Sequence, residues 1–378
     1  MDGYPPVAFV RAGSESRALT GLRGLAALLV MAHHFKLHFG LADRLPVLGG
    51  LLQKGYLGVD LFFVLSGFVM AMTYGDWFDG HRPGWPAYIR FLVRRVARLW
   101  PLHAAMIGVW VAFGLALPRF PYSAHVLAAN LMLIQAWGLS GAINPPAWSV
   151  STELFAYLAF PALAWLALRG GRRAVFCAVA VAALYVAATQ LGPPLEEGRR
   201  GPLDLYRNYS WLPVLRCVAG FALGMLAWRM GSRPRLRRLL SAPWAAPAIL
   251  ASASLLMWAG AYDLWVVPLL PALILATHLG RGPFYRALGH GPIHYLGLVS
   301  YAVYLVHLVL LVNIDRWATS LWLEMPIYLE MPVYLAATLL FATVLHAAIE
   351  VPGRSVMRGI GEALLDRLVP HHTSHPGH

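Results

Sequence analysis

Long apolar stretches alternate with short polar linkers along almost the whole chain of 378 residues. Each stretch is close to the roughly 20 apolar residues that a helix needs to cross a bilayer. The pattern therefore predicts ten membrane-spanning helices with no soluble domain between them. The predicted spans lie near residues 19–39, 56–75, 98–117, 148–168, 173–191, 211–229, 243–260, 262–279, 294–314 and 332–350.

An eleventh apolar stretch, at residues 122–138, sets the orientation of everything that follows it. Loops rich in Arg and Lys stay on the cytoplasmic side of a membrane. If 122–138 is re-entrant or interfacial, every basic cluster falls on that side and the acidic loop 192–210 falls outside. We therefore predict an all-α polytopic membrane protein of ten spans plus this extra helix, with both termini in the cytoplasm.

Three segments follow from the same pattern. Residues 1–18 form a cytoplasmic N-terminal segment, and residues 19–354 form the membrane-embedded domain. Residues 355–378 form a cytoplasmic tail, which is rich in His and is predicted to be disordered. The first apolar run contains charged and imidazole side chains, and no small-residue cleavage site follows it. We interpret it as a retained helix and not as a signal peptide.

Composition agrees with a membrane protein, since 59% of the residues are hydrophobic and 12% are charged, against roughly 25% charged in soluble domains. The net charge of +13 is concentrated in Arg clusters at the ends of the spans. It therefore reports topology and gives no reason to expect a nucleic-acid partner. Both cysteines fall inside apolar runs, so no disulfide and no metal site is predicted. The oligomeric state stays open.

Five ionisable side chains from five predicted spans fall at nearly one depth, near the outer ends of those spans. A charge in the hydrocarbon costs on the order of 2 kcal/mol or more, so such residues mark candidate functional sites. Snorkelling or a satisfied buried contact could explain any one of them, but the whole set at one depth favours a common polar site. The five are His34, Asp60, Glu153, Arg216 and His307.

A second polar layer lies near the inner ends of the spans. Arg23 precedes His34 by three helical turns, so both lie on one face of the first helix. Arg94, Arg95 and Arg98 follow helical spacing at the start of the third span, which suits a phosphate group or an ordinary positive-inside flank. Such a polar column fits a transporter of an anionic solute or a transmembrane group-transfer enzyme.

Six stretches carry a resemblance. "LTGLRGLAALLVMAHHF" places Arg23 and His34 in a first-helix motif with ten residues between them, and "WSVSTELFAY" gives a Trp-Ser-x-Ser-x-Glu motif. The others are "LGVDLFFVLSGF" (57–68), "RRVARLWP" (94–101), "GLVSYAVYLVH" (297–307) and "EVPGR" (350–354). In this order they resemble the acyltransferase-3 family of integral membrane acyltransferases. Many relatives carry Asp where this chain has Thr20, and we assign no role to that position.

The resemblance implies transfer of an acyl group, usually acetyl from acetyl-coenzyme A, to a hydroxyl of a saccharide or surface glycan. It also implies an integral protein of the bacterial cytoplasmic membrane that uses the coenzyme A thioester as co-substrate and no metal. Two alternatives stay open. One is a transporter or flippase of an anionic lipid-linked sugar without chemistry, and the other is an acyltransferase acting on a small hydrophobic acceptor.

The same resemblance, together with the two layers, assigns roles to residues. His34 would be the general base, and Asp60 or Glu153 would orient it. The coenzyme would be held by Arg23, Arg94, Arg95 and Arg98. The transition state and the acceptor would be contacted by Tyr304, His307, Ser151, Tyr157 and Arg216. Ser66 or Ser151 could serve as a nucleophile, but a helix Ser more often bonds to its own backbone.

Overall fold

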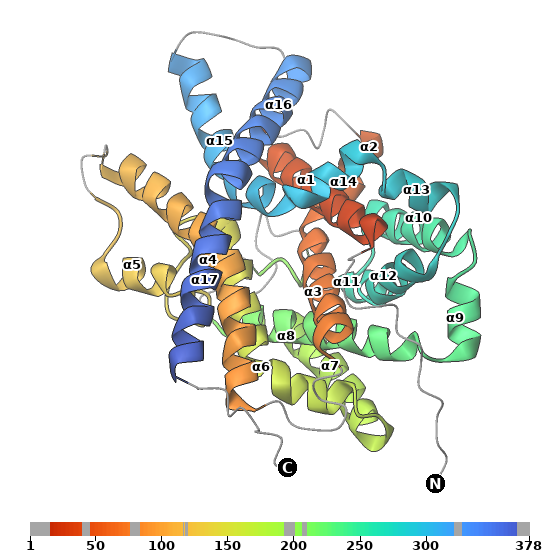
Figure 1. The fold of residues 1–378 in the computed structure, drawn as a ribbon. Helices are drawn as coiled ribbons and strands as arrows, with labels where there is room; N and C mark the ends of the chain where they lie inside the picture. Colours follow the sequence, from red (N-terminus) through yellow and green to blue (C-terminus); the bar gives the residue numbers. More distant parts are fainter. Residues whose placement is uncertain are drawn as a thin grey trace.

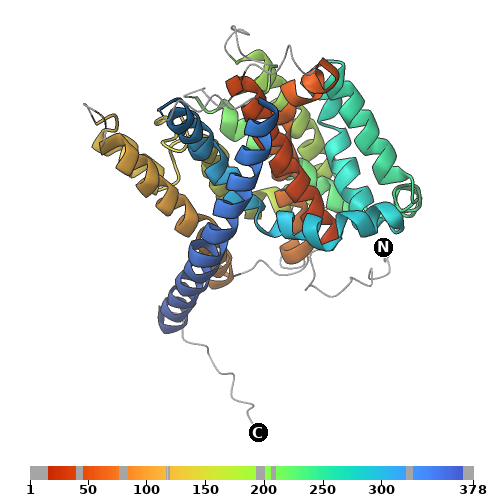
Figure 2. The ribbon, with the colours of Figure 1, turned by 90° about the horizontal axis from the view of Figure 1, so that it is seen from above.

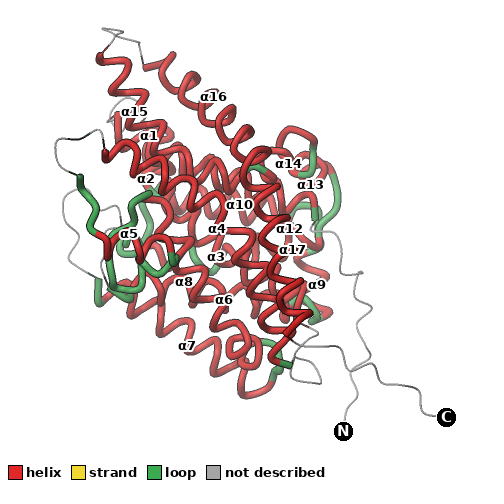
Figure 3. Tube along the Cα trace, turned by 60° about the vertical axis from the view of Figure 1, so that its left-hand side comes forward, coloured by secondary structure: helices red, strands yellow, loops and turns green. Residues whose placement is uncertain are grey.

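The computed structural model describes residues 16–39, 46–75, 84–115, 117, 120–192, 201–205, 210–320 and 327–368, and these form helices and no strand. Figure 3 shows that short loops join the helices through most of the described chain. The elements are α1 Arg17–Phe39, α2 Pro46–Gln53, a 3₁₀ turn Gly55–Leu57, α3 Gly58–Tyr74, α4 Trp85–Leu115, α5 Ala124–Leu131, a 3₁₀ turn Pro145–Ala147, α6 Trp148–Ala167, α7 Gly171–Gln190, α8 Leu212–Met230, α9 Pro234–Leu240, α10 Ala245–Trp258, α11 Asp263–Val266, α12 Leu269–Leu279, α13 Pro283–Leu288, α14 Gly291–Leu298, α15 Ser300–Ser320, α16 Ile327–Leu345, a π-helical turn His346–Glu350 and α17 Val351–Leu368.

The fold class is the predicted one, an all-α polytopic membrane protein. Within the described residues, seven helices are long and apolar enough to cross a membrane, and nine are if each of two bent helix pairs forms one span. Helices α9 and α10 meet at 75°, and α14 and α15 meet at 70°. The predicted span at 262–279 is formed by α11 and α12, which give a shorter apolar helix, Asp263–Leu279.

Helix α4 begins earlier than predicted, because its polar first half pairs with α17 instead of ending at the membrane surface. It starts at Trp85, well before the expected start near residue 98. The side chain of Arg90 donates to Asp366 at 2.7 Å, and that of Arg94 donates to Glu362 at 2.8 Å. The two helices lie side by side in Figure 1 and Figure 2. Ion pairs therefore extend the helix beyond its apolar part.

Helix α17 replaces part of the predicted disordered tail. The helical segment Leu329–Leu368 is continuous over 40 residues and includes the π-helical turn. At 1.5 Å per residue this is about 60 Å, twice the thickness of the hydrocarbon layer. Residues 355–368 are thus helical, whereas 369–378 lie outside the described residues. The apolar pattern missed this helix because its stability comes from contacts with α4.

The stretch at 122–138 does not form a span. Helix α5 has eight residues, too few to cross a bilayer, and the chain then turns back towards α6. Asn130 is fully buried, and its amide donates to the carbonyl of Gly141 and accepts from the backbone N–H of Ile143. The backbone carbonyl oxygen of Asn130 lies 2.8 Å from Nε2 of His103 in α4. These bonds satisfy several backbone groups of an irregular segment whose buried part is centred on Asn130.

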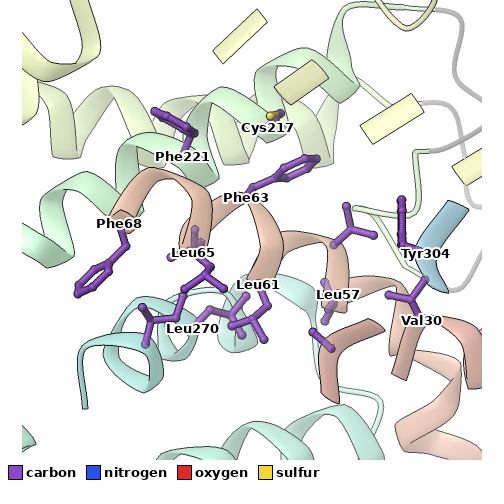
Figure 4. Close-up of a cluster of buried hydrophobic side chains, with 14 of the residues drawn as sticks. Val30, Leu57, Leu61, Phe63, Leu65, Phe68, Cys217, Phe221, Leu270 and Tyr304 are labelled. Carbon is purple, nitrogen blue, oxygen red and sulfur yellow. The ribbon is translucent and has the colours of Figure 1, made fainter. Parts of the chain in front are cut away.

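Helix α3 is the central element, and it packs on α8 with unusually close backbones. A Cβ on Gly67 of α3 would collide with the carbonyl oxygen of Phe221, and one on Gly224 of α8 would collide with that of Val64. Small residues at such crossings let membrane helices approach closely. Figure 4 shows the apolar side chains around α3, with Leu65 beside Leu270 of α12.

The close approach makes a prediction for Gly224→Ala. The added methyl group meets backbone atoms of α3 that only a shift of the whole helix could move, so we expect a loss of about 1–3 kcal/mol of stability. The matched control is Gly108→Ala in α4, where a Cβ meets nothing within 4 Å. We expect the control to be neutral or slightly stabilising, because Ala favours a helix more than Gly. Thermal unfolding in detergent measures both, and equal melting temperatures for the two variants would contradict the packing argument.

Candidate functional site

Helices α1 and α15 bring two histidines into direct contact inside the bundle. The Nε2 atom of His307 lies 3.2 Å from Nδ1 of His34, and the ring centroids are 5.0 Å apart. The Nδ1 atom of His34 also lies 2.9 Å from the carbonyl oxygen of Val30, and Nδ1 of His307 lies 2.7 Å from that of Tyr304. His307 is fully buried, whereas His34 is half-buried. Two residues predicted at one depth thus form a pair.

The carbonyl contacts fix which nitrogens carry protons when both rings are neutral. A carbonyl oxygen only accepts hydrogen bonds, so Nδ1 must be the protonated nitrogen in His307 and in His34. The Nε2 atom of His307 is then an acceptor for the Nδ1–H of His34. This assignment leaves Nε2 of His34 with a free lone pair, the arrangement that a general base needs. Among the described residues, no side chain or backbone group forms a hydrogen bond with Nε2 of His34.

The carboxylate of Asp60 pairs with Arg216 and not with His34. Arg216 donates from Nε to Oδ1 at 3.0 Å and from Nη2 to Oδ2 at 2.5 Å, and both side chains are almost completely buried. Arg216 also contacts the carbonyl of Tyr56 and lies over the ring of Trp148. The pair joins α3 to α8. Such a two-point pair satisfies both charges and leaves neither available to a substrate.

Glu153 of α6 accepts two hydroxyl groups and likewise does not contact His34. The hydroxyls of Ser66 and Tyr157 both donate to Oε1 at 2.6 Å, and they lie 3.2 Å from each other. Ser66 therefore bonds across to another helix and not to its own backbone, contrary to the expectation for a helix Ser. Glu153 and Ser66 keep partial exposure, whereas Tyr157 is buried.

The inner end of this polar region is centred on Arg23 of α1. Glu153, Arg98 and Glu350 all lie within electrostatic range of its guanidinium group. Glu350 is buried on the π-helical turn and is bonded at 2.9 Å to Nδ1 of His346. A π-helical turn within a longer helix frequently occurs at a functional site. Two cations and two carboxylates thus meet between α1, α4, α6 and the π-helical turn.

The three Arg residues that were predicted to bind one phosphate group point to different partners. Arg94 is held by Glu362 of α17. Arg95 lies against α3, where it donates to the hydroxyl of Tyr74 at 3.2 Å and contacts the sulfur of Met70. Arg98 lies within electrostatic range of Arg23. Helical spacing gave their positions along α4 correctly but not their partners.

Two further predicted residues have different environments. Ser151 is fully buried and accepts from the backbone N–H of Ala136, so it fastens the re-entrant segment to α6. Tyr304 bonds to the hydroxyl of Ser149 at 2.8 Å, and its ring packs against Phe62. Tyr304 faces the polar region, whereas Ser151 is turned away from it.

Sequence reasoning missed a buried cluster centred on Asp263. Asp263 accepts from Lys54 at 2.7 Å and from the hydroxyl of Tyr56 at 2.8 and 2.9 Å, and it also accepts the backbone N–H of Leu203. The ring of Tyr56 packs on His33. The signal available in the sequence was an Asp at the start of an apolar run, which resembles an ordinary helix start.

The polar groups form one column through the bundle, from the two histidines to the π-helical turn. Tyr304 connects the histidine pair to Glu153 in this column, because it lies beside His307 and within electrostatic range of Glu153. Several members contact one another across helices and keep partial exposure. These partly exposed members are His34, Phe62, Ser66, Glu153, Arg23, Arg98 and Tyr301. Among the described residues, no group of three His, Cys, Asp or Glu side chains is arranged to hold a metal ion.

Comparison with known proteins agrees with the motifs. The profile of the acyltransferase-3 family, described as an acyltransferase domain, matches residues 16–347. The chain therefore belongs to this family, and membership supports acyl transfer by an integral membrane protein. No solved structure matches the chain.

Three curated proteins are similar over much of their length. "Acyltransferase MdmB" of Streptomyces mycarofaciens is 31% identical over 324 residues, 78% of each chain. "Putative membrane-bound transacylase BcsY" of Komagataeibacter xylinus is 28% identical over 323 residues, 78% of this chain and 72% of that one. "Protein 2 in picA locus" of Rhizobium radiobacter is 34% identical over 176 residues, 41% of this chain and 81% of that one.

The Asp60–Arg216 pair predicts non-additive stability effects. Removing one partner leaves a buried charge, so Asp60→Leu and Arg216→Met should each cost about 3–5 kcal/mol. The double variant leaves no unpaired charge, and we expect it to be more stable than either single variant. Thermal unfolding of the three variants in detergent measures this coupling. A double variant whose loss equals the sum of the two single losses would show that the pair does not hold α3 to α8.

Proposed function

We propose that this protein transfers an acyl group from a cytosolic acyl-coenzyme A, in the first instance acetyl-coenzyme A, to a hydroxyl group on the outer side of the membrane. The observation that carries the proposal is the free Nε2 of His34, at the outer end of a polar column whose inner end is cationic. The proposal requires a route for the slender pantetheine arm along the partly exposed members of this column. The protein would reside in a bacterial cytoplasmic membrane, where such a coenzyme is available on one face.

In the proposed reaction, His34 Nε2 removes the proton of the acceptor hydroxyl as its oxygen attacks the thioester carbon. The tetrahedral intermediate collapses, the carbon–sulfur bond breaks, and the imidazolium returns its proton to the departing thiolate. The products are an ester and free coenzyme A. His307 holds the tautomer of His34 through its Nε2 lone pair, the part that a carboxylate plays in a Ser-His-Asp triad. The hydroxyl of Tyr304, which lies beside His307, is a candidate donor to the developing oxyanion.

At the inner end, Arg98 and Arg23 are the best candidates to hold the phosphates of the coenzyme. Arg98 forms no ion pair with another described residue, and it lies within electrostatic range of Arg23. Arg95 could add a donor after leaving Tyr74. Arg94 is the least suited of the four, because Glu362 already neutralises it.

The acceptor is proposed to be a saccharide hydroxyl, in a surface glycan or a glycolipid. Glu153 and Tyr157 offer the carboxylate and hydroxyl groups that sugar recognition uses, and both lie in the middle of the column. The similar BcsY is described as a transacylase, which supports a group-transfer reaction of this kind. A small hydrophobic acceptor is the runner-up, since the column is lined on one side by Phe62 and other apolar groups.

A transporter or flippase without chemistry is the rival from another class. Purified protein incubated with labelled acetyl-coenzyme A and candidate acceptors distinguishes the two. An acyltransferase releases free thiol in proportion to ester formed, whereas a transporter moves a solute and releases none. Mass spectrometry of glycans and lipids from cells with and without the gene identifies the acceptor.

His34→Ala should lower turnover by at least about 10²-fold, because a positioned general base contributes about 10²–10⁴-fold. Coenzyme binding should be nearly unchanged, since His34 is distant from the inner Arg residues. His125→Ala, on the exposed face of α5, is the matched control and should retain full activity. Thiol release under saturating donor measures the effect. Retention of more than about a tenth of wild-type turnover by His34→Ala would remove His34 as the base.

His307 should act on the turnover number and not on donor binding. His307→Leu removes the side-chain acceptor of the His34 N–H and leaves only the carbonyl of Val30, whereas His307→Gln keeps an acceptor oxygen near the imidazole position. We therefore expect a loss of about tenfold or more in kcat for Leu, and partial recovery for Gln, with the KM for the donor unchanged in both. Equal activity of the two variants would show that His307 only fills space.

Arg98→Ala should weaken coenzyme A binding by about tenfold or more, because a charge-assisted hydrogen bond is worth about 1.5–3 kcal/mol. Arg94→Ala removes the same charge one turn away and should change binding by less than about threefold. Equilibrium binding of labelled coenzyme A to both purified variants measures the contrast. If Arg98→Ala binds coenzyme A as tightly as wild type, Arg98 does not bind the coenzyme and serves only as part of the positive-inside flank.

A further inference from the structure

A strongly basic segment joins α8 to α10, at the right-hand side of Figure 1, and the acyl-transfer proposal does not use it. Five Arg residues lie within residues 229–238, and residues 205–262 contain no Asp or Glu. Four of these Arg side chains are exposed, on and beside α9. A positive-inside flank requires charge of this sign, but it requires no particular shape.

The segment also has a shape. A shallow, open hollow of about 660 Å³ lies between the last residue of α8, Met230, and the short helix α9. Arg233 and Arg235 lie on its wall, and the apolar side chains of Met230, Leu236 and Leu239 form the rest of the lining, together with a proline. Met230 and Leu239 are 41% and 53% exposed. Two cations beside a strip of exposed apolar surface match an amphiphile with a phosphate group.

The position of the hollow favours a membrane lipid. It lies at the junction of two candidate spans, α8 and the bent pair of α9 and α10, and we infer that this basic junction lies at the membrane surface. Trp244, at the bend before α10, is 61% exposed, and Trp residues commonly mark the interface between hydrocarbon and water. Clusters of Arg at this level attract the anionic lipids of a cytoplasmic leaflet. A nucleotide would find the same cations but no partner for the apolar strip.

We propose that this hollow binds one anionic phospholipid. Its phosphate lies between Arg233 and Arg235, and an acyl chain lies along Met230, Leu236 and Leu239. Arg237 and Arg238 lie on the same helix but do not line the hollow. They contribute to the general charge of the surface only. This site is separate from the polar column and does not depend on the acyl-transfer reaction.

Native mass spectrometry of the full chain in detergent tests the site, with phosphatidylglycerol and phosphatidylcholine of identical acyl chains as probes. We expect phosphatidylglycerol to be retained preferentially. The variant Arg233→Ala/Arg235→Ala should weaken its binding by about tenfold, and Arg237→Ala/Arg238→Ala by less than about twofold. Both variants change exposed residues and should unfold at the wild-type temperature, which controls for misfolding.

Three outcomes would overturn the proposal. Equal losses in the two double variants would show diffuse surface attraction without a built site. Equal retention of both lipids would show that charge does not select the ligand. If free coenzyme A displaces the lipid from the wild type and binds no longer to Arg233→Ala/Arg235→Ala, the hollow is a nucleotide site. Leu239→Gln tests the apolar strip. It should weaken the binding of phosphatidylglycerol and leave the weak binding of glycerol phosphate unchanged.

Discussion

Asp60 and Arg216 are buried in helices that cross the bilayer, where water does not solvate either charge. An unpaired charge in such a place costs several kcal/mol, so each side chain needs the other in one geometry. The glycines of α3 and α8 bring the two backbones close enough for two parallel hydrogen bonds to form. Because α3 also carries Ser66 and Phe62, this crossing determines where the middle of the polar column lies.

The same requirement for paired charges shapes the histidine site. Asp60 is committed to Arg216, and Glu153 is committed to the hydroxyls of Ser66 and Tyr157. Neither carboxylate is left to orient His34, and the lone pair of His307 takes that position. A neutral imidazole fixes the tautomer of its neighbour as a carboxylate does, but it stabilises a developing positive charge less. The proposed base is therefore held in place without a negative charge beside it.

The sequence motifs differed in how well they predicted the contacts of their residues. The three turns between Arg23 and His34 correctly indicated one helix face with a cation at one end and an imidazole at the other. The Arg-Arg-x-x-Arg motif was less informative, because Arg94 is paired with a helix more than 250 residues later in the chain. Asp263 was missed for a related reason, since its partner Lys54 comes from a distant linker.

The sequence by itself determined the helical class and the approximate spans. The bilayer imposes these, because a spanning segment must satisfy its own backbone and match the hydrocarbon thickness. Only the tertiary structure decided which polar groups at one depth are partners, and which nitrogen of each histidine carries the proton. Pairing depends on the rotation and crossing of helices, and a hydrogen bond forms only within about 3 Å. Periodicity along one helix carries no information on distances of that size between two helices.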